Sequence, residues 1–271
     1  MMTRILVAVI GLPVLLAVLF LLPPIATVLM LCAMSALAVY ELLYRTKLVQ
    51  NIYLIAVSAF MSVAVCVWSY FGCPWMFALM GIWVYFMAVF AAVLKSHGKL
   101  PFAEVCISAF SCIVIPLLWS SLARILVMDF GRYYILVPLV LAFSADSGAY
   151  FVGVFFGKHK MAPIISPKKT WEGFAGGVAC AMLIMFAYTL VLEHAFSVEV
   201  NYVAAVVYGA LGSVTSVVGD LIFSVVKRQT GIKDYGNLLP GHGGVLDRFD
   251  SMCLVAPMVE SLLLVFPLIV S

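Results

Sequence analysis

The chain has 271 residues, of which 66% are hydrophobic and 10% are charged, and its mean hydropathy is +1.20. A water-soluble domain carries about 25% charged residues, so this composition excludes an ordinary soluble enzyme. The net charge of +3 is too small to indicate nucleic-acid binding through bulk electrostatics. The composition therefore predicts an all-α polytopic membrane protein.

Nine mainly apolar segments of about 20 residues, the length of a membrane helix, follow one another along the chain. They cover approximately residues 5–22, 25–44, 52–71, 75–94, 103–127, 133–156, 171–192, 202–227 and 245–269. The first run resembles a signal peptide, but no small-residue cleavage site follows it, so we expect a membrane helix there.

The basic residues predict the orientation of these helices. If the N-terminus is cytosolic, 13 of the 15 Lys and Arg residues lie in inner loops, and the outer loops receive only Arg124 and Arg132. The positive-inside rule therefore favours a cytosolic N-terminus.

The two halves of the chain differ in chemistry. Residues 1–130, with about five predicted helices, contain few ionisable side chains; Glu41 and Glu104 are expected near span ends, where water or headgroups reach them. Residues 131–271, with about four predicted helices, carry carboxylates inside spans and long polar inner loops. We expect residues 1–130 to be a scaffold or dimer surface and residues 131–271 to be the catalytic domain.

The sixth predicted helix contains a carboxylate, Asp146, in the run from Ser144 to Phe151. A charge in the middle of a membrane helix costs several kcal/mol unless it is paired or hydrated, so Asp146 is a candidate functional residue. A buried structural role stays open. The nearby stripe of Gly148, Gly153 and Gly157 favours close helix packing.

A compact basic group precedes the seventh predicted helix. Pro167 interrupts helical structure, and Thr170 is a candidate N-cap whose helix would present free N–H groups beside two lysines. This pattern predicts a phosphate site, although an ordinary positive loop would also explain part of it. The candidate phosphate-binding residues are Ser166, Lys168, Lys169 and Thr170.

The densest polar segment lies around the last inner loop. Asp220 is a carboxylate inside the eighth predicted helix, and Asp247 and Asp250 lie one helical turn apart beyond the loop. Hard carboxylate oxygens suit Mg²⁺ held together with waters and substrate phosphates. The loop between them also carries glycines for close backbone approach and several basic residues. These additional candidates are Lys227, Arg228, Lys233, His242, Gly243, Gly244 and Arg248.

The segment Ser224-x-Val226-Lys227-Arg228-x4-Lys233-Asp234-x-Gly236-x2-Leu239-Pro240-x-His242-Gly243-Gly244-Val245-x-Asp247-Arg248-Phe249-Asp250 resembles the full signature of phosphatidate cytidylyltransferases. We refer to it as the 224–250 signature. The upstream runs Asp146-Ser147-Gly148-Ala149-Tyr150 and Ser166-Pro167-Lys168-Lys169-Thr170-x-Glu172-Gly173 also resemble that family. The resemblance covers roughly the last 140 residues, while the first half matches only as a hydrophobic scaffold.

The resemblance implies the reaction of CTP with phosphatidate to give CDP-diacylglycerol and pyrophosphate. It further implies dependence on Mg²⁺ with a second metal such as K⁺, and a homodimer in the cell inner membrane that works at its cytosolic side. Matched to the family, Asp220 and Asp247 are the first choice as metal ligands, with Asp250 and Asp146 second.

The basic residues have less specific roles in this hypothesis. Lys168, Lys169 and Lys233 would hold the CTP phosphates, and Lys227, Arg228 and Arg248 would hold either CTP or the lipid phosphate. His242 would donate to a phosphate or stabilise the turn.

Two other classes of protein compete with this hypothesis. In an ion-coupled transporter, Asp146 and Asp220 would be ion or proton sites, but the long motif between the last two predicted spans would have no role. A CTP-dependent lipid kinase would yield CDP and a lipid phosphate instead of releasing pyrophosphate.

Overall fold

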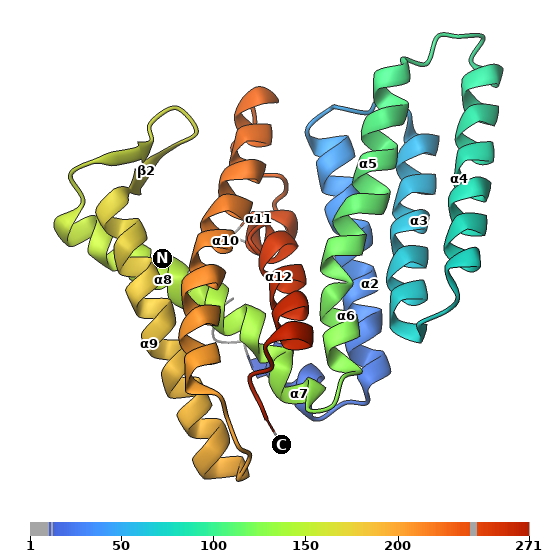
Figure 1. Ribbon diagram of the computed structural model, residues 1–271. Coiled ribbons are helices and arrows are strands. Elements are labelled where there is room, and N and C mark those ends of the chain that lie inside the picture. Colours follow the sequence, from blue (N-terminus) through green and yellow to red (C-terminus); the bar gives the residue numbers. More distant parts are fainter. Residues whose placement is uncertain (1–10, 12, 239–242, 271) are drawn as a thin grey trace. The chain divides into compact units, whose positions relative to one another are not determined.

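The computed structural model describes residue 11, residues 13–238 and residues 243–270, and most of them are helical (Figure 1). The elements before residue 160 are α2 (Pro24–Tyr40), the π-helix η1 (Glu41–Arg45), α3 (Ile52–Phe71), α4 (Trp75–Lys95), α5 (Phe102–Trp119), α6 (Ser121–Leu126), α7 (Gly131–Tyr134) and α8 (Leu136–Phe156), and a short β-hairpin follows them. After it come α9 (Trp171–Phe196), α10 (Tyr202–Gln229), α11 (Leu246–Phe249) and α12 (Met252–Val265).

The helical class is confirmed, with one small addition. Seven stretches of the described residues are long and apolar enough to cross a membrane: Pro24–Arg45, Ile52–Phe71, Trp75–Lys95, Phe102–Leu126, Gly131–Phe156, Trp171–Phe196 and Tyr202–Gln229. The addition is an antiparallel hairpin of β1 (Lys160–Ala162) and β2 (Ser166–Thr170), in which Lys160 pairs with Thr170 and Ala162 with Ser166. The count of nine spans and the cytosolic N-terminus stay predictions.

The first and the last predicted spans account for the difference between the nine predicted spans and the seven candidate spans of the described residues. In the first predicted span, 5–22, residues 5–10 and residue 12 lie outside the described part of the chain. The predicted span at 245–269 is divided into the short α11 and the 14-residue α12, which is about 21 Å long and shorter than the hydrocarbon core. At the division, the Asp250 carboxylate accepts the Ser251 N–H at 2.8 Å.

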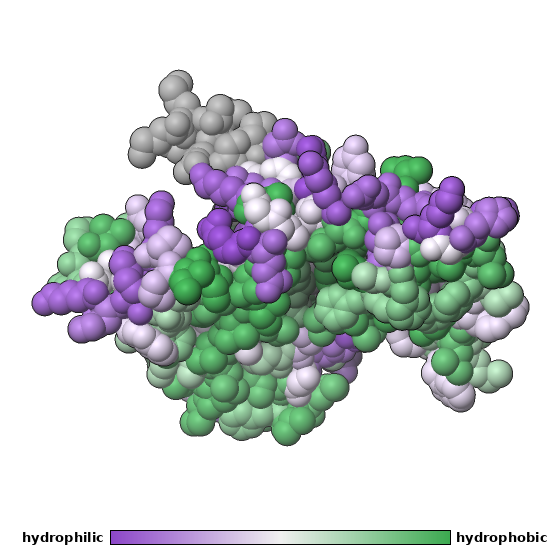
Figure 2. Space-filling view, turned by 90° about the horizontal axis from the view of Figure 1, so that it is seen from above, coloured by the Kyte–Doolittle hydropathy of each residue, from purple (hydrophilic) through white to green (hydrophobic). Residues whose placement is uncertain are grey.

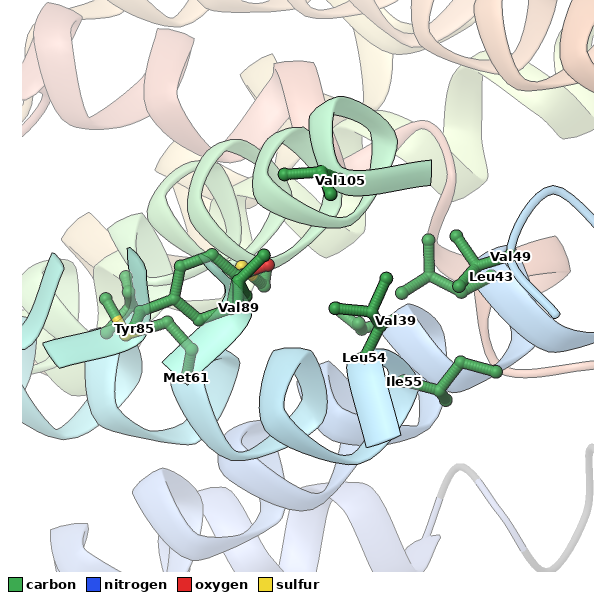
Figure 3. Close-up of a cluster of buried hydrophobic side chains, with 11 residues drawn as sticks. Val39, Leu43, Val49, Leu54, Ile55, Met61, Tyr85, Val89 and Val105 are labelled. Carbon is green, nitrogen blue, oxygen red and sulfur yellow. The ribbon is translucent and has the colours of Figure 1, made fainter. Parts of the chain in front are cut away.

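The described chain forms two compact units, which we describe separately. Unit 1 comprises residues 1–132 and 227–249, and unit 2 comprises residues 133–226 and 250–271. Unit 1 contains a hydrophobic cluster where α2, α3, α4 and α5 meet, with Leu43, Leu54, Tyr85 and Val89 almost fully buried (Figure 3). Within it the Ser58 and Tyr85 hydroxyls are 3.1 Å apart, so these two buried polar groups satisfy each other.

Unit 2 is built on close contact between α8 and α9. A Cβ added at Gly148 would lie 2.4 Å from the Cys180 Cβ, and one at Gly177 would lie 2.7 Å from the Ala145 carbonyl oxygen. Such distances are possible only without a side chain, so the glycines allow the two helices to approach closely. The sequence prediction of a packing role is thereby confirmed for Gly148.

Hydrophobic side chains also cover much of the outer surface. In the view of Figure 2 hydrophobic residues dominate, and hydrophilic residues gather in patches. On α4 alone, Trp75, Met76, Phe77 and Trp83 are exposed. An apolar surface of this extent is typical of a membrane protein, whose helices satisfy their own backbone groups and face lipid.

Candidate active site

In unit 1, Asp247 at the start of α11 organises the chain around it. Its Oδ2 accepts the N–H groups of Tyr235 at 2.7 Å and Gly244 at 2.9 Å. Its Oδ1 accepts from the Lys227 ammonium at 3.1 Å. The Asp247 side chain is only 1% exposed, so these three hydrogen bonds compensate for much of the cost of burying its charge.

Lys227 reaches Asp247 from the C-terminal turn of α10. Its side chain is 11% exposed, and its Nζ lies 5.3 Å from the centre of the Tyr235 ring. That distance is within the range of a cation–π interaction. Lys227 is therefore held between a carboxylate and an aromatic face.

A second carboxylate in this cluster escaped the sequence analysis. Glu41 was expected to lie near water or headgroups, and this expectation is wrong because the residue is only 4% exposed. Its two oxygens accept the N–H groups of Val245 at 3.1 Å and Leu246 at 2.9 Å. A carboxylate at the end of an apolar span was the available signal, but nothing in the local sequence indicated its partners.

Gly243 and Gly244 make room for these carboxylates in the segment between α10 and α11, residues 230–245. We call it the α10–α11 segment. Gly243 has a φ of +89°, and a Cβ there would lie 2.8 Å from the Asp247 Oδ2. A Cβ at Gly244 would lie 2.4 Å from the Glu41 carboxylate oxygens. Among the substrate-binding candidates of this segment, His242 lies outside the described residues.

In unit 2, Asp220, the other first-choice metal ligand, forms an ion pair. The Lys169 Nζ lies 2.5 Å from the Asp220 Oδ2, and the Ser224 hydroxyl donates to the Asp220 Oδ1 at 3.3 Å. The two charged side chains are 23% and 27% exposed. The structure thus brings together Lys169 of β2 and Asp220 of α10, two candidates that are far apart in sequence.

The predicted N-cap at Thr170 is confirmed. Its backbone is extended, with φ −127° and ψ 155°, and its Oγ1 accepts the Gly173 N–H at 3.1 Å. Glu172 in the first turn of α9 accepts the N–H groups of Lys158 at 3.1 Å and His159 at 3.2 Å, and its Oε1 is 2.5 Å from the His159 Nδ1. The helix start and the basic loop before it are therefore tied together.

The secondary metal candidates differ in environment. Asp250 is 6% exposed, beside the backbone of Gly219, where an added Cβ would lie 3.0 Å from the Ser251 Cα. Gly219, the residue before Asp220, therefore allows α10 to approach the start of α12 closely. Asp146, by contrast, is exposed on α8.

The remaining basic candidates lie at the surface. Lys168, Arg228, Lys233 and Arg248 are exposed, and Ser166 is partly exposed in β2. Exposed cations on long side chains suit recognition of a mobile polyanion, because they can reorient toward its phosphates.

Comparison with known proteins assigns the family. The cytidylyltransferase family model matches residues 2–266. The chain belongs to the cytidylyltransferase family. It is 44% identical over 138 residues to the phosphatidate cytidylyltransferase of Bacillus subtilis (strain 168), a match covering 51% of this chain and 50% of that protein.

Two staphylococcal relatives named phosphatidate cytidylyltransferase give similar values. That of Staphylococcus saprophyticus is 39% identical and that of Staphylococcus aureus (strain COL) is 40% identical, each over 134 residues and about half of either chain. The chain thus spans about half the length of the curated relatives it matches.

The donor set of this cytidylyltransferase-family chain suits a metal that arrives with its substrate. Among the described residues, no three His, Cys, Asp or Glu side chains form a group that holds a metal by itself. Mg²⁺ commonly takes one or two carboxylates and completes its shell with waters and substrate phosphates. Asp220 is the more accessible candidate, since its side chain is 27% exposed whereas that of Asp247 is 1% exposed.

Proposed function

We propose that the chain is a phosphatidate cytidylyltransferase, which converts CTP and phosphatidate to CDP-diacylglycerol and pyrophosphate. The observation that carries this proposal is the complete 224–250 signature, in which Lys227, Tyr235, Gly244 and Asp247 form one hydrogen-bonded cluster. The names of the relatives at 39–44% identity support the same activity.

The proposed reaction joins two polyanions. A phosphate oxygen of phosphatidate attacks the α-phosphorus of CTP, a new P–O bond forms, and the bond to the bridging oxygen breaks so that pyrophosphate leaves. The attacking oxygen is already anionic and needs little help from a base. The work of the protein is therefore to position the phosphates and to offset their charge.

The basic residues divide by accessibility in this proposal. Exposed Lys168, Lys233 and Arg248 are available to bind phosphates. Lys169 supplies its charge beside Asp220, next to the capped N-terminus of α9. Lys227, which is mostly buried against Asp247, serves chiefly to hold the signature in shape.

We propose Mg²⁺ as the cofactor, with Asp220 as its first ligand candidate and Asp247, Asp250 and Asp146 after it. When bound, Mg²⁺ offsets the charge of the triphosphate and of the leaving pyrophosphate. A second ion such as K⁺ belongs to the same proposal. We further propose that the protein is a homodimer in the cell inner membrane, with its active site on the cytosolic side.

The test uses purified protein in mixed micelles with phosphatidate, Mg²⁺ and CTP labelled in the α-phosphate. We expect labelled CDP-diacylglycerol and unlabelled pyrophosphate, and loss of both when EDTA removes divalent ions. Release of labelled CDP when a lipid alcohol is offered in place of phosphatidate would identify a lipid kinase. Absence of CDP-diacylglycerol with phosphatidate would refute the proposed cytidylyltransferase.

A substitution at Asp220 tests its assignment as a metal ligand. We expect Asp220→Asn to lower kcat by about 100-fold or more, since an amide oxygen is a weaker ligand and a poorer partner for Lys169. Asp129→Asn is the matched control, because Asp129 is an exposed carboxylate in the turn before α7. Near-full activity of Asp220→Asn would refute its assignment as the ligand.

A further inference from the structure

Two carboxylates bind three consecutive backbone N–H groups at the end of the α10–α11 segment. Asp247 accepts from Gly244 at 2.9 Å, and Glu41 accepts from Val245 at 3.1 Å and Leu246 at 2.9 Å. These amides begin α11 and have no carbonyl partner within that short helix. Asp247 belongs to the signature, but Glu41 comes from the far end of the sequence, 204 residues before Val245.

The space around Glu41 is shaped for a carboxylate. A Cβ at Gly236 would lie 2.4 Å from the Glu41 Oε1, and one at Gly244 would lie 2.4 Å from each carboxylate oxygen. The Glu41 carboxylate therefore lies against two backbone stretches of the α10–α11 segment, at positions where only glycine allows so close an approach. Both glycines are fixed positions of the 224–250 signature.

Glu41 also begins an unusual helical turn. Residues Glu41–Arg45 form the π-helix η1 at the end of the first described span. At its other end the Arg45 guanidinium donates to the Asn237 Oδ1 at 3.0 Å. The turn therefore contacts the α10–α11 segment at two points, and π-helical turns are rare features that occur frequently at functional sites.

Burying the Glu41 and Asp247 carboxylates close together costs free energy, which a specific role would justify. Glu41 and Asp247 are both buried and close to the same three amides, so their negative charges repel. A glutamine could accept only one of the two hydrogen bonds, because its NH₂ group would face a second N–H. Two acceptor oxygens on one side chain are what this pair of amides requires.

We propose that Glu41 is a positioning residue, which fixes the Val245 and Leu246 amides and thereby holds the Asp247 carboxylate and Lys227 in place for nucleotidyl transfer. Its catalytic consequence rests on the proposed function, but its effect on the backbone does not. Glu41 acts through Asp247 and touches neither substrate.

The first test is hydrogen–deuterium exchange of Glu41→Gln in detergent, without CTP, phosphatidate or Mg²⁺. Hydrogen bonds to charged groups are stronger than neutral ones, and we expect exchange in peptides covering Gly243–Phe249 to rise by about 10- to 100-fold. Glu104→Gln is the matched control: Glu104 lies at the start of another span, is only partly buried, and accepts one N–H, from Gln50 at 3.1 Å. Peptides from α3 should be unchanged in both variants.

The second test is kinetic. We expect Glu41→Gln to lower kcat by about tenfold or more, with wild-type KM for CTP, while Glu104→Gln retains wild-type values. Glu41→Asp keeps both acceptor oxygens and should recover part of the lost kcat. A merely structural role would reduce the yield of folded protein without this separation of kcat from KM or this partial recovery.

A variant on the opposite side of the contact covers the case in which Glu41→Gln does not fold. Gly244→Ala places a methyl group against the Glu41 carboxylate and should also increase exchange across Gly243–Phe249. Wild-type exchange in Gly244→Ala, or Glu41→Gln behaving like Glu104→Gln, would overturn the proposal. If wild-type protein makes no CDP-diacylglycerol, the proposed function fails while the exchange experiment still decides the role of Glu41.

Discussion

Replacing Asp247 by asparagine separates a structural role from metal binding. The asparagine oxygen can still accept the Tyr235 and Gly244 N–H groups, because both donate to the same aspartate oxygen. Its NH₂ group would then face the Lys227 ammonium, where the aspartate Oδ1 accepts at 3.1 Å. The substitution therefore leaves a lysine that is 11% exposed without its counter-ion.

The expected loss of stability follows from this burial. Removing one partner of a buried ion pair costs about 3–5 kcal/mol, and we expect the lower end, about 3 kcal/mol, because the Lys227 charge keeps its cation–π contact with Tyr235. Lys227→Met should cost about 1–3 kcal/mol, since it removes one charge-assisted hydrogen bond from Asp247. In the double variant the orphaned charge is gone, so the two losses should fall short of additivity by about 1–3 kcal/mol.

The assay is reversible SDS titration in mixed micelles, which gives the free energy of unfolding of the four proteins in the cycle. EDTA is present throughout, so a metal ion contributes nothing to the measured stability. The reasoning would be refuted if Asp247→Asn changed the unfolding free energy by less than about 0.5 kcal/mol. Any activity lost in Asp247→Asn would then be attributed to metal binding and not to the stability of the fold.

The glycines give further predictions for the same titration. Gly243→Ala should cost about 2–3 kcal/mol, because φ is +89° and the methyl would meet the neighbouring carboxylate at 2.8 Å. Gly231→Ala, at φ +71° with nothing within 4 Å, should cost only about 1 kcal/mol, and equal losses would contradict the steric explanation. Gly148→Ala should cost about 1–3 kcal/mol, since its methyl would lie 2.4 Å from a side-chain carbon of α9. Gly81→Ala, with 3.8 Å of clearance, should be neutral within about 0.5 kcal/mol, and similar losses at both helical glycines would argue against close α8–α9 packing.

Local features of the sequence predicted much of the structure. The apolar runs between 25 and 227 became helices, because a 20-residue apolar segment in lipid must satisfy its own backbone. Thr170 caps α9, as its position after Pro167 indicated. The hairpin before α9 was missed, since it is a short strand pair with no alternation of hydrophobic and polar residues.

The candidate site was predictable in its residues but not in its pairings. Asp220 and Asp247 were both expected as metal ligands, yet the structure gives each of them a lysine partner, Lys169 and Lys227 respectively. Charge patterns show that carboxylates and lysines are present near one membrane boundary. They do not show which of them pair, because the choice depends on how helices and loops pack.

The sequence by itself determined the membrane class, most helices and the family signature, because these follow from composition, periodicity and contiguous residues. Only the tertiary structure decided that Glu41 is buried against Val245 and Leu246. The sequence does not show which acceptor a backbone N–H will bind. A carboxylate such as Glu41 could equally bind water, a cation or an amide. The end of the span Pro24–Arg45 packs against the α10–α11 segment, and this packing brings the Glu41 carboxylate to the Val245 and Leu246 amides.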